Sequence, residues 1–161
     1  MLGIMQDSVM TKNGYENLKE QLRKMKTFDR QEIIKEIATA AAHGDLSENA
    51  EYDAAKEKQS FVEGKIKEIE QRLASAQIID PALISSDKIA FGATIVLEDE
   101  DRGGEVTYQI VGLDEADVGQ GKISLSSPIA RAFIGKSVDD FIEVKTPGGV
   151  RSYTVVEIRF E

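Results

Sequence analysis

Two apolar seams with helical spacing constrain the first half of this chain more than any other feature. The first seam begins with Tyr15, Leu18, Leu22 and Met25. Intervals of three and four residues are the a/d pattern of a helix that packs against another helix. The second seam has the same intervals over residues 62–73. Because each apolar stripe needs a partner and only a short turn separates them, the two seams predict an antiparallel helical hairpin.

The expected hairpin is long for a chain of 161 residues. After Phe28 the first seam resumes at Ile33, Ile34, Ile37, Ala38 and Ala41. The second seam also includes Ala55 and extends to Ala76. Each arm therefore has about 30 residues, which at about 1.5 Å per residue gives a projection of about 45 Å. A rod of this length predicts that its tip reaches a site on a partner.

The second half of the chain changes to the period of β-strands. Pro81 follows the run Ile78-Ile79-Asp80 and is expected to stop the preceding helix, which divides the chain into a hairpin domain (1–80) and a second domain (81–161). The expected strands are 93–97, 106–111, 122–125, 141–145 and 152–160, with a short helix from Pro128 to about Gly135. This pattern predicts an α+β fold in which a small antiparallel domain follows the hairpin. Residues 1–9 show no periodicity and are expected to be irregular.

The composition excludes several classes of function. The net charge of −9 disfavours unaided binding to nucleic acid, because phosphate backbones repel an acidic protein. The chain has no cysteine and one histidine, which excludes thiol catalysis, disulfides and multi-histidine metal sites. No segment approaches the roughly 20 apolar residues of a membrane helix, and the start has no signal-peptide pattern. We therefore expect a cytoplasmic protein.

The expected hairpin tip, residues 43–52, concentrates carboxylates. Asp45 and Glu48 are three residues apart and Glu51 follows. One interpretation is a capping box, with Asp45 as the N-cap of the second helix and Glu48 reaching back. The other is a Mg²⁺ site, because Mg²⁺ takes one or two protein carboxylates and keeps several waters. A lone pair of carboxylates binds Mg²⁺ weakly, so such a site needs ligands from a partner.

Other residues near the tip have structural and functional interpretations side by side. His43 is expected to be a turn residue, and Tyr52 either packs in the seam or stacks on a base. Lys56 and Lys58 either meet phosphate or belong to a solvated face. The acidic run Glu98–Asp101 is expected to be a solvated hairpin turn.

Taken together, these motifs resemble the bacterial Gre transcript-cleavage factors. The segments that carry the resemblance are 43–52, 54–57, 63–66, 73–79, 91–94, 127–131 and 145–149. They occur in order over nearly the whole chain from Met10. The modest basic content of the hairpin is more similar to the GreA type than to the GreB type. The resemblance implies an N-terminal coiled-coil hairpin and a C-terminal FKBP-like domain.

The resemblance also implies a working position and a set of roles. The C-terminal domain docks at the rim of the secondary channel of RNA polymerase, and the hairpin enters the pore. Asp45 and Glu48 then help to hold the second Mg²⁺ of the polymerase active site, where the 3′ segment of backtracked RNA is hydrolysed. Contacts with the nascent RNA fall to Lys56, with Asn49, Glu51 and Tyr52 as further candidates. Ser127 and Pro128 match the docking loop, although Pro128 also suits a first helical turn.

Three functions remain as alternatives on the sequence alone. The first is a cleavage and elongation factor that has no activity without polymerase and binds no metal tightly by itself. The second is a regulator that occupies the channel and inhibits, for which the carboxylate pair is unnecessary. The third, a structural adaptor or prolyl isomerase, leaves the acidic tip unexplained and lacks an aromatic-rich pocket. We expect a monomer in the free state, because the seams satisfy each other.

Overall fold

The computed structural model describes residues 8–44 and 49–161, which form two compact units. Residues 16–75 make one unit, and residues 8–15 together with 76–161 make the other. These compact units divide between Ser75 and Ala76, and the described start of the chain belongs with the C-terminal part. No described helix is long and apolar enough to cross a membrane.

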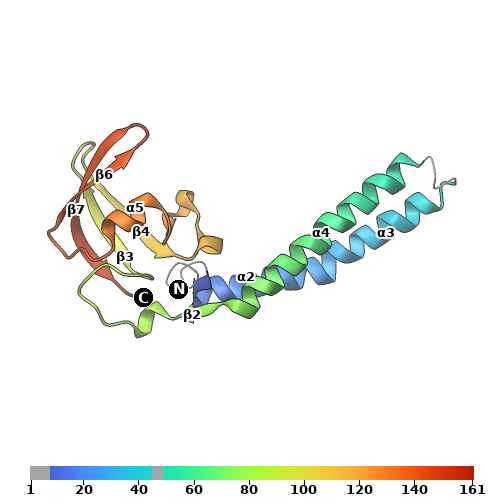
Figure 1. Cartoon of the computed structure of the whole chain (residues 1–161), viewed down its shortest axis with the longest axis horizontal. Helices are drawn as coiled ribbons and strands as arrows, with labels where there is room; N and C mark the ends of the chain where they lie inside the picture. Colours follow the sequence, from blue (N-terminus) through green and yellow to red (C-terminus); the bar gives the residue numbers. More distant parts are fainter. Residues whose placement is uncertain (1–7, 45–48) are drawn as a thin grey trace. The chain divides into compact units, whose positions relative to one another are not determined.

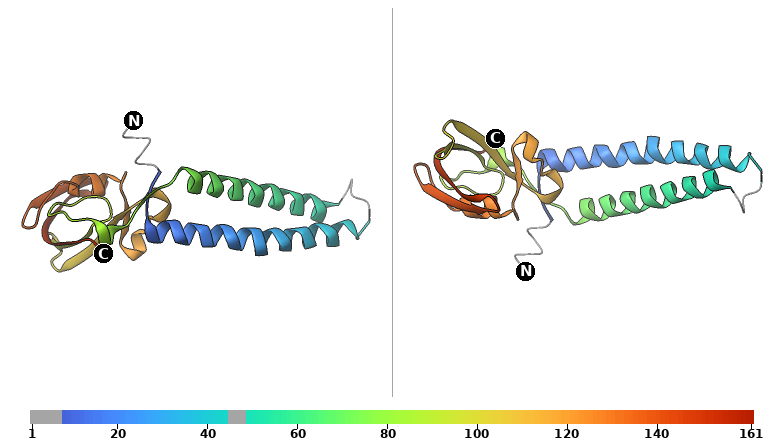
Figure 2. Two further views of the ribbon diagram at one scale, coloured as in Figure 1. Left: turned by 90° about the horizontal axis from the view of Figure 1, so that it is seen from below. Right: turned by 90° about the horizontal axis from the view of Figure 1, so that it is seen from above.

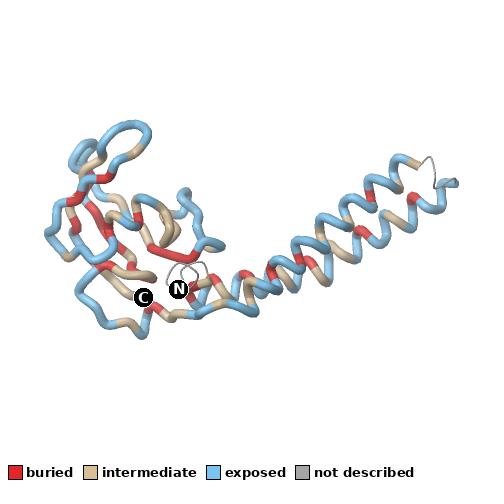
Figure 3. Tube along the Cα trace, in the orientation of Figure 1, coloured by how far each residue is buried: buried red, intermediate tan, exposed pale blue. Residues whose placement is uncertain are grey.

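The first unit is the expected helical hairpin. Its first arm consists of α2 (Lys12–Lys24), a π-helical turn (Met25–Asp29) and α3 (Arg30–Ala41). The second arm is α4 (Ala50–Ser75), which runs back alongside α3 (Figure 2). Buried positions follow the facing sides of the two arms (Figure 3). The long hairpin with a turn near Gly44 is thus confirmed.

The π-helical turn explains how the first arm keeps its apolar seam in register. The buried apolar residues of the first arm are Leu18, Met25, Ile33 and Ala40, at intervals of seven, eight and seven. An extra residue in the second interval would rotate the seam away from the partner helix, but a π-helical turn accommodates it. Three residues of the predicted seam are exposed instead: Ile34 (46%), Ala38 and Ala41, and Ala40 is buried in place of Ala41.

The second unit contains a five-stranded sheet with one helix (Figure 1). The strands are β3 (Thr94–Asp99), β4 (Glu105–Val111), β5 (Lys122–Ser124), β6 (Phe141–Thr146) and β7 (Gly149–Arg159), in the order β5-β4-β3-β7-β6. Short 3₁₀ turns cover Pro81–Leu83, Leu113–Glu115 and Val118–Gln120. The predicted α+β class with an antiparallel-rich sheet is confirmed. One pair departs from it, because β5 runs parallel to β4.

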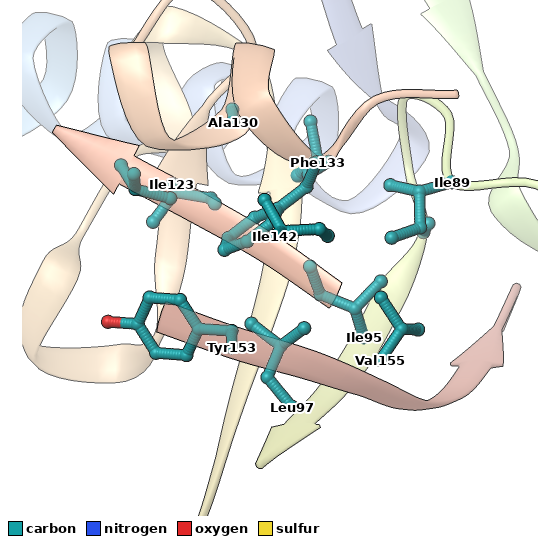
Figure 4. Close-up of a cluster of buried hydrophobic side chains, with 12 residues drawn as sticks. Ile89, Ile95, Leu97, Ile123, Ala130, Phe133, Ile142, Tyr153 and Val155 are labelled. Atoms are coloured by element: carbon teal, nitrogen blue, oxygen red, sulfur yellow. The ribbon is translucent and has the colours of Figure 1, made fainter. Parts of the chain in front are cut away.

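The core of this unit lies between the sheet and α5 (Pro128–Phe133) (Figure 4). Phe133 is fully buried and meets the ring of Tyr153 edge-on, with centroids 5.7 Å apart. Ile95, Leu97 and Val155 from the central strands complete the contact. Buried residues two positions apart, Ile95 and Leu97 on β3 and Tyr153 and Val155 on β7, lie on one face, although Val96 between the first two is buried as well.

A parallel strand pair joins the start of the chain to the segment after α4. β1 (Val9–Thr11) pairs with β2 (Gln77–Ile79). Val9 is therefore not part of an irregular start, and Met10 is only 2% exposed. The run Ile78-Ile79 is a strand and not the end of a helix, since α4 stops at Ser75.

Candidate functional site at the hairpin tip

The tip of the hairpin is framed by the end of α3 and the start of α4. Gly44 follows α3 with a φ of +125°, which an L side chain rarely adopts. Asp45 and Glu48, the two predicted metal ligands, lie outside the described residues, as do Leu46 and Ser47. The described flanks on both sides nevertheless determine which cap the second helix uses.

Asn49 caps α4 and ties it to the other arm. Its Oδ1 accepts a hydrogen bond from the Tyr52 amide N–H at 3.0 Å, which is the N-cap interaction with the third helical residue. Its Nδ2 donates to the Ala40 carbonyl at 2.6 Å. Because α4 begins at Ala50, the N-cap position belongs to Asn49. The predicted capping box of Asp45 and Glu48 lies outside the described residues.

The candidate RNA-contact residues flank this cap. Glu51 is exposed, and its Oε2 lies 3.5 Å from Nδ1 of His43, so the histidine has a carboxylate neighbour that the sequence did not indicate. Tyr52 is half-buried on the first turn of α4. Lys56 is exposed and donates to Gln59 Oε1 at 3.0 Å. Asn49, the fourth candidate, uses both its side-chain nitrogen and its side-chain oxygen in hydrogen bonds.

The donor chemistry of the tip suits a hard cation. Within residues 8–44 and 49–161, no group of three or more His, Asp or Glu side chains could hold a metal ion. The carboxylate oxygens of Asp45 and Glu48 are the ligand type that Mg²⁺ prefers, but two of them leave most of its octahedral positions to other ligands. A Mg²⁺ site built on these two side chains would therefore need ligands from a partner.

The predicted docking residues lie at the start of α5. Ser127 is the N-cap: its Oγ accepts from the Ala130 amide at 3.2 Å and donates to the Ser124 carbonyl at 2.7 Å. Pro128 occupies the first turn, where its missing N–H costs nothing. Both residues thus have a structural role that fixes the loop before α5, and their contact with a partner stays a prediction.

The acidic run Glu98–Asp101 differs from the solvated turn that we expected. Asp99 is 4% exposed, accepts the amide N–H groups of Asp101 and Arg102, and meets the Arg151 guanidinium at 2.7 Å. These hydrogen bonds hold the pKa of the Asp99 carboxyl below its usual value, and the bond from the Arg102 amide has the largest effect. The run fastens the β3–β4 turn to β7, and its link with Arg151 spans 52 residues, which no local pattern reveals.

A second carboxylate that the sequence did not single out lies beside the first turn of α2. Glu115 accepts hydrogen bonds from Thr11, through both its amide and its hydroxyl, and from the Gly112 amide. A Cβ on Gly14 would collide with the Glu115 side chain, and one on Gly112 would lie 2.2 Å from the Val9 carbonyl oxygen. The two glycines permit this close approach and were the available sequence signal.

Comparisons with known proteins cover nearly the whole chain. Residues 8–78 match the family model described as transcription elongation factor, N-terminal, and residues 84–160 match that for transcription elongation factor, GreA/GreB, C-term. Transcription elongation factor GreA of Alkalilimnicola ehrlichii is 57% identical, over 94% of this chain and 96% of its own. GreA of Neisseria meningitidis serogroup A is 54% identical, over 97% and 99%. The crystal structure of GreA factor homolog 1 (Gfh1) of Thermus thermophilus is 32% identical over 94% and 97%, with a TM-score of 0.43.

Proposed function

The chain belongs to the GreA/GreB family of transcription elongation factors, and we propose that it acts by stimulating RNA cleavage by RNA polymerase. In this proposal the hairpin enters the secondary channel of the polymerase, and the 3′ segment of backtracked RNA is hydrolysed there. The polymerase performs the hydrolysis, and the factor has no activity alone. Removal of the displaced 3′ segment restarts an arrested complex.

The observation that carries the proposal is the cap of α4. Asn49 supplies the N-cap of α4, and we infer that the carboxylates of Asp45 and Glu48 serve a different purpose. In this proposal the two carboxylates act on a ligand outside the chain. A long two-helix rod with such a tip matches the need to carry carboxylates into a deep site.

A shared Mg²⁺ gives these carboxylates a function. When bound, the ion would stabilise charge on the RNA phosphate and supply a water with a lowered pKa. Asp45 and Glu48 would provide two oxygen ligands, and polymerase carboxylates and the RNA phosphate would provide the rest. We therefore expect the free chain to bind Mg²⁺ weakly.

The neighbouring residues would orient the RNA. Lys56 is exposed on α4 and would meet a phosphate, and the exposed part of Tyr52 would stack on a base. Glu51 can accept a hydrogen bond from a water or a ribose hydroxyl. Asn49 would act chiefly by holding the first turn of α4, since a contact of its amide with RNA would displace an existing bond.

Docking at the rim of the channel is assigned to the loop before α5. The cap made by Ser127 and the fixed φ of Pro128 give this loop one conformation, which lowers the entropy cost of binding a partner surface. The nascent RNA 3′ end is then contacted only within the elongation complex, which agrees with the acidic net charge of −9.

Cleavage in a stalled, backtracked complex with cognate polymerase and Mg²⁺ tests the proposal. We compare the native chain with Asp45→Asn and Glu48→Gln, and measure polymerase binding in parallel. The variants are expected to bind as the native chain does and to cleave at least about tenfold more slowly, which corresponds to about 1.4 kcal/mol of lost transition-state stabilisation. A native chain that binds without stimulating cleavage would instead support the channel-occupying regulator.

A further inference from the structure

One face of the hairpin exposes two large aromatic side chains. Phe61 on α4 is 71% exposed, and Phe28 in the π-helical turn is 63% exposed. Scattered single apolar residues are normal on a surface, but these two line one groove together with Met25. The groove has a volume of about 620 Å³.

A second groove of about 600 Å³ lies on the other side of Phe61, toward the tip. Phe61 and Asp29 line both grooves. We call them the tip-side groove and the base-side groove. They form one continuous strip, because the α4 residues that line them follow at helical intervals on one face.

The two grooves carry opposite charge. The tip-side groove has four carboxylates, those of Asp29, Glu32, Glu36 and Glu57, against the single cation Lys58. The base-side groove has the cations Arg23, Lys24 and Lys65 against the single carboxylate of Asp29.

On α4 the pattern is symmetric about the aromatic ring. Glu57 lies four residues before Phe61 and Lys65 lies four residues after it. A two-fold rotation through Phe61 therefore exchanges an acidic position with a basic one.

We propose that this strip binds a second copy of the chain in an antiparallel, two-fold symmetric dimer. In such an isologous contact the tip-side groove of each copy meets the base-side groove of the other. Glu57 then faces Lys65 of the second copy twice over, and the two Phe61 rings meet at the axis. The strip complements itself in both charge and apolar surface.

Ion pairs within the hairpin do not prevent this exchange. Arg23 pairs with Glu20 at 2.6 Å, Lys65 with Glu68 at 3.8 Å, and Lys58 with Glu36 at 3.2 Å. All six side chains are largely exposed, and pairs of this kind contribute little stability. They can therefore exchange partners when a second copy binds. The proposed dimer departs from our expectation of a monomer, which considered only the seam between the two helical arms.

The dimer would regulate the proposed function, and only this consequence rests on that proposal. A hairpin whose face is covered by another hairpin cannot enter a narrow channel at the same time. Dilution, or capture of the monomer by polymerase, would release it by mass action.

Sedimentation equilibrium of the full chain from micromolar to about 1 mM tests the dimer. The native chain should approach twice the monomer mass, and added salt should weaken the association. Glu57→Lys and Lys65→Glu should each raise the dissociation constant by about tenfold, since each turns two attractive contacts into repulsive ones. Lys67→Glu makes the same charge change at an exposed position outside both grooves and should leave the association unchanged.

The decisive experiment mixes the two single variants. A Glu57→Lys chain and a Lys65→Glu chain have complementary strips, so the mixture should dimerise about tenfold more tightly than either variant alone. Circular dichroism confirms that both are folded. A native chain that stays monomeric throughout, or a mixture that stays monomeric, would overturn the proposal.

Discussion

Replacing Asn49 by alanine should loosen the tip of the hairpin without unfolding the rod. The change removes the N-cap acceptor for the Tyr52 amide, which costs about 1 kcal/mol. It also removes the donor to the Ala40 carbonyl, worth about 1 kcal/mol more. A local loss of about 2 kcal/mol should raise the opening equilibrium of the first turns of α4 by about thirtyfold.

Native-state amide hydrogen exchange measures this opening directly. In Asn49→Ala, the amides of Ala54 and Ala55 should exchange about thirtyfold faster, and that of buried Ile69 at the other end of α4 should not change. Asn49→Asp is the matched control, because it keeps the cap acceptor and loses only the donor. It should show about a fivefold effect. Equal exchange in Asn49→Ala and the native chain would refute our account of the cap.

Three further predictions concern the second unit. The lowered pKa of Asp99 means that its stabilising effect is present above about pH 4 and is lost as pH falls through its folded-state pKa, so Asp99→Asn should show a shallower loss of stability between pH 5 and 2 in acid titrations followed by circular dichroism. Phe133→Ala should lower the free energy of unfolding by about 4 kcal/mol in urea, whereas a change of similar size at exposed Phe141 should cost far less. Gly112→Ala should displace the Val9 carbonyl and speed amide exchange along β2, and unchanged exchange would show that β1 does not rely on this close approach.

Local patterns predicted most of the fold because the elements repeat at short range. The seam from Leu18 to Ile33 depends on residues within one or two helical turns of each other. The period of β3 and β7 depends on residues two positions apart. The parallel pair of β1 and β2 could not be predicted in this way. Val9 and Gln77 are 68 residues apart, and the three-residue strands are too short to show a period.

The π-helical turn was not predicted, although the sequence contains the irregular interval that causes it. The interval of eight residues between Met25 and Ile33 was present in the sequence, and it appeared only as an interruption after Phe28. An α-helix cannot accommodate that interval without rotating the seam. The partner helix α4 supplies the constraint that selects the π conformation, so tertiary packing decides it.

The sequence identified candidate functional residues but not the groups that their side chains contact. Asp-x-x-Glu satisfied the rule for a capping box, yet the N-cap of α4 is Asn49, because α4 starts one residue after it. Asp99 looked solvated within its acidic run, but Arg151 and two backbone amides surround its carboxylate. In both places the outcome depends on backbone geometry that a residue pattern does not contain.

The central claim, that the hairpin tip works at the RNA 3′ end inside polymerase, is tested by cross-linking. The chain has no cysteine, so His43→Cys provides a unique attachment point for a short photoreactive group beside the tip. Lys67→Cys, at an exposed position far along α4, is the control. In a backtracked complex we predict an adduct with the 3′-terminal RNA segment from position 43 and none from position 67. A factor that binds polymerase but gives no RNA adduct from position 43 would contradict the account.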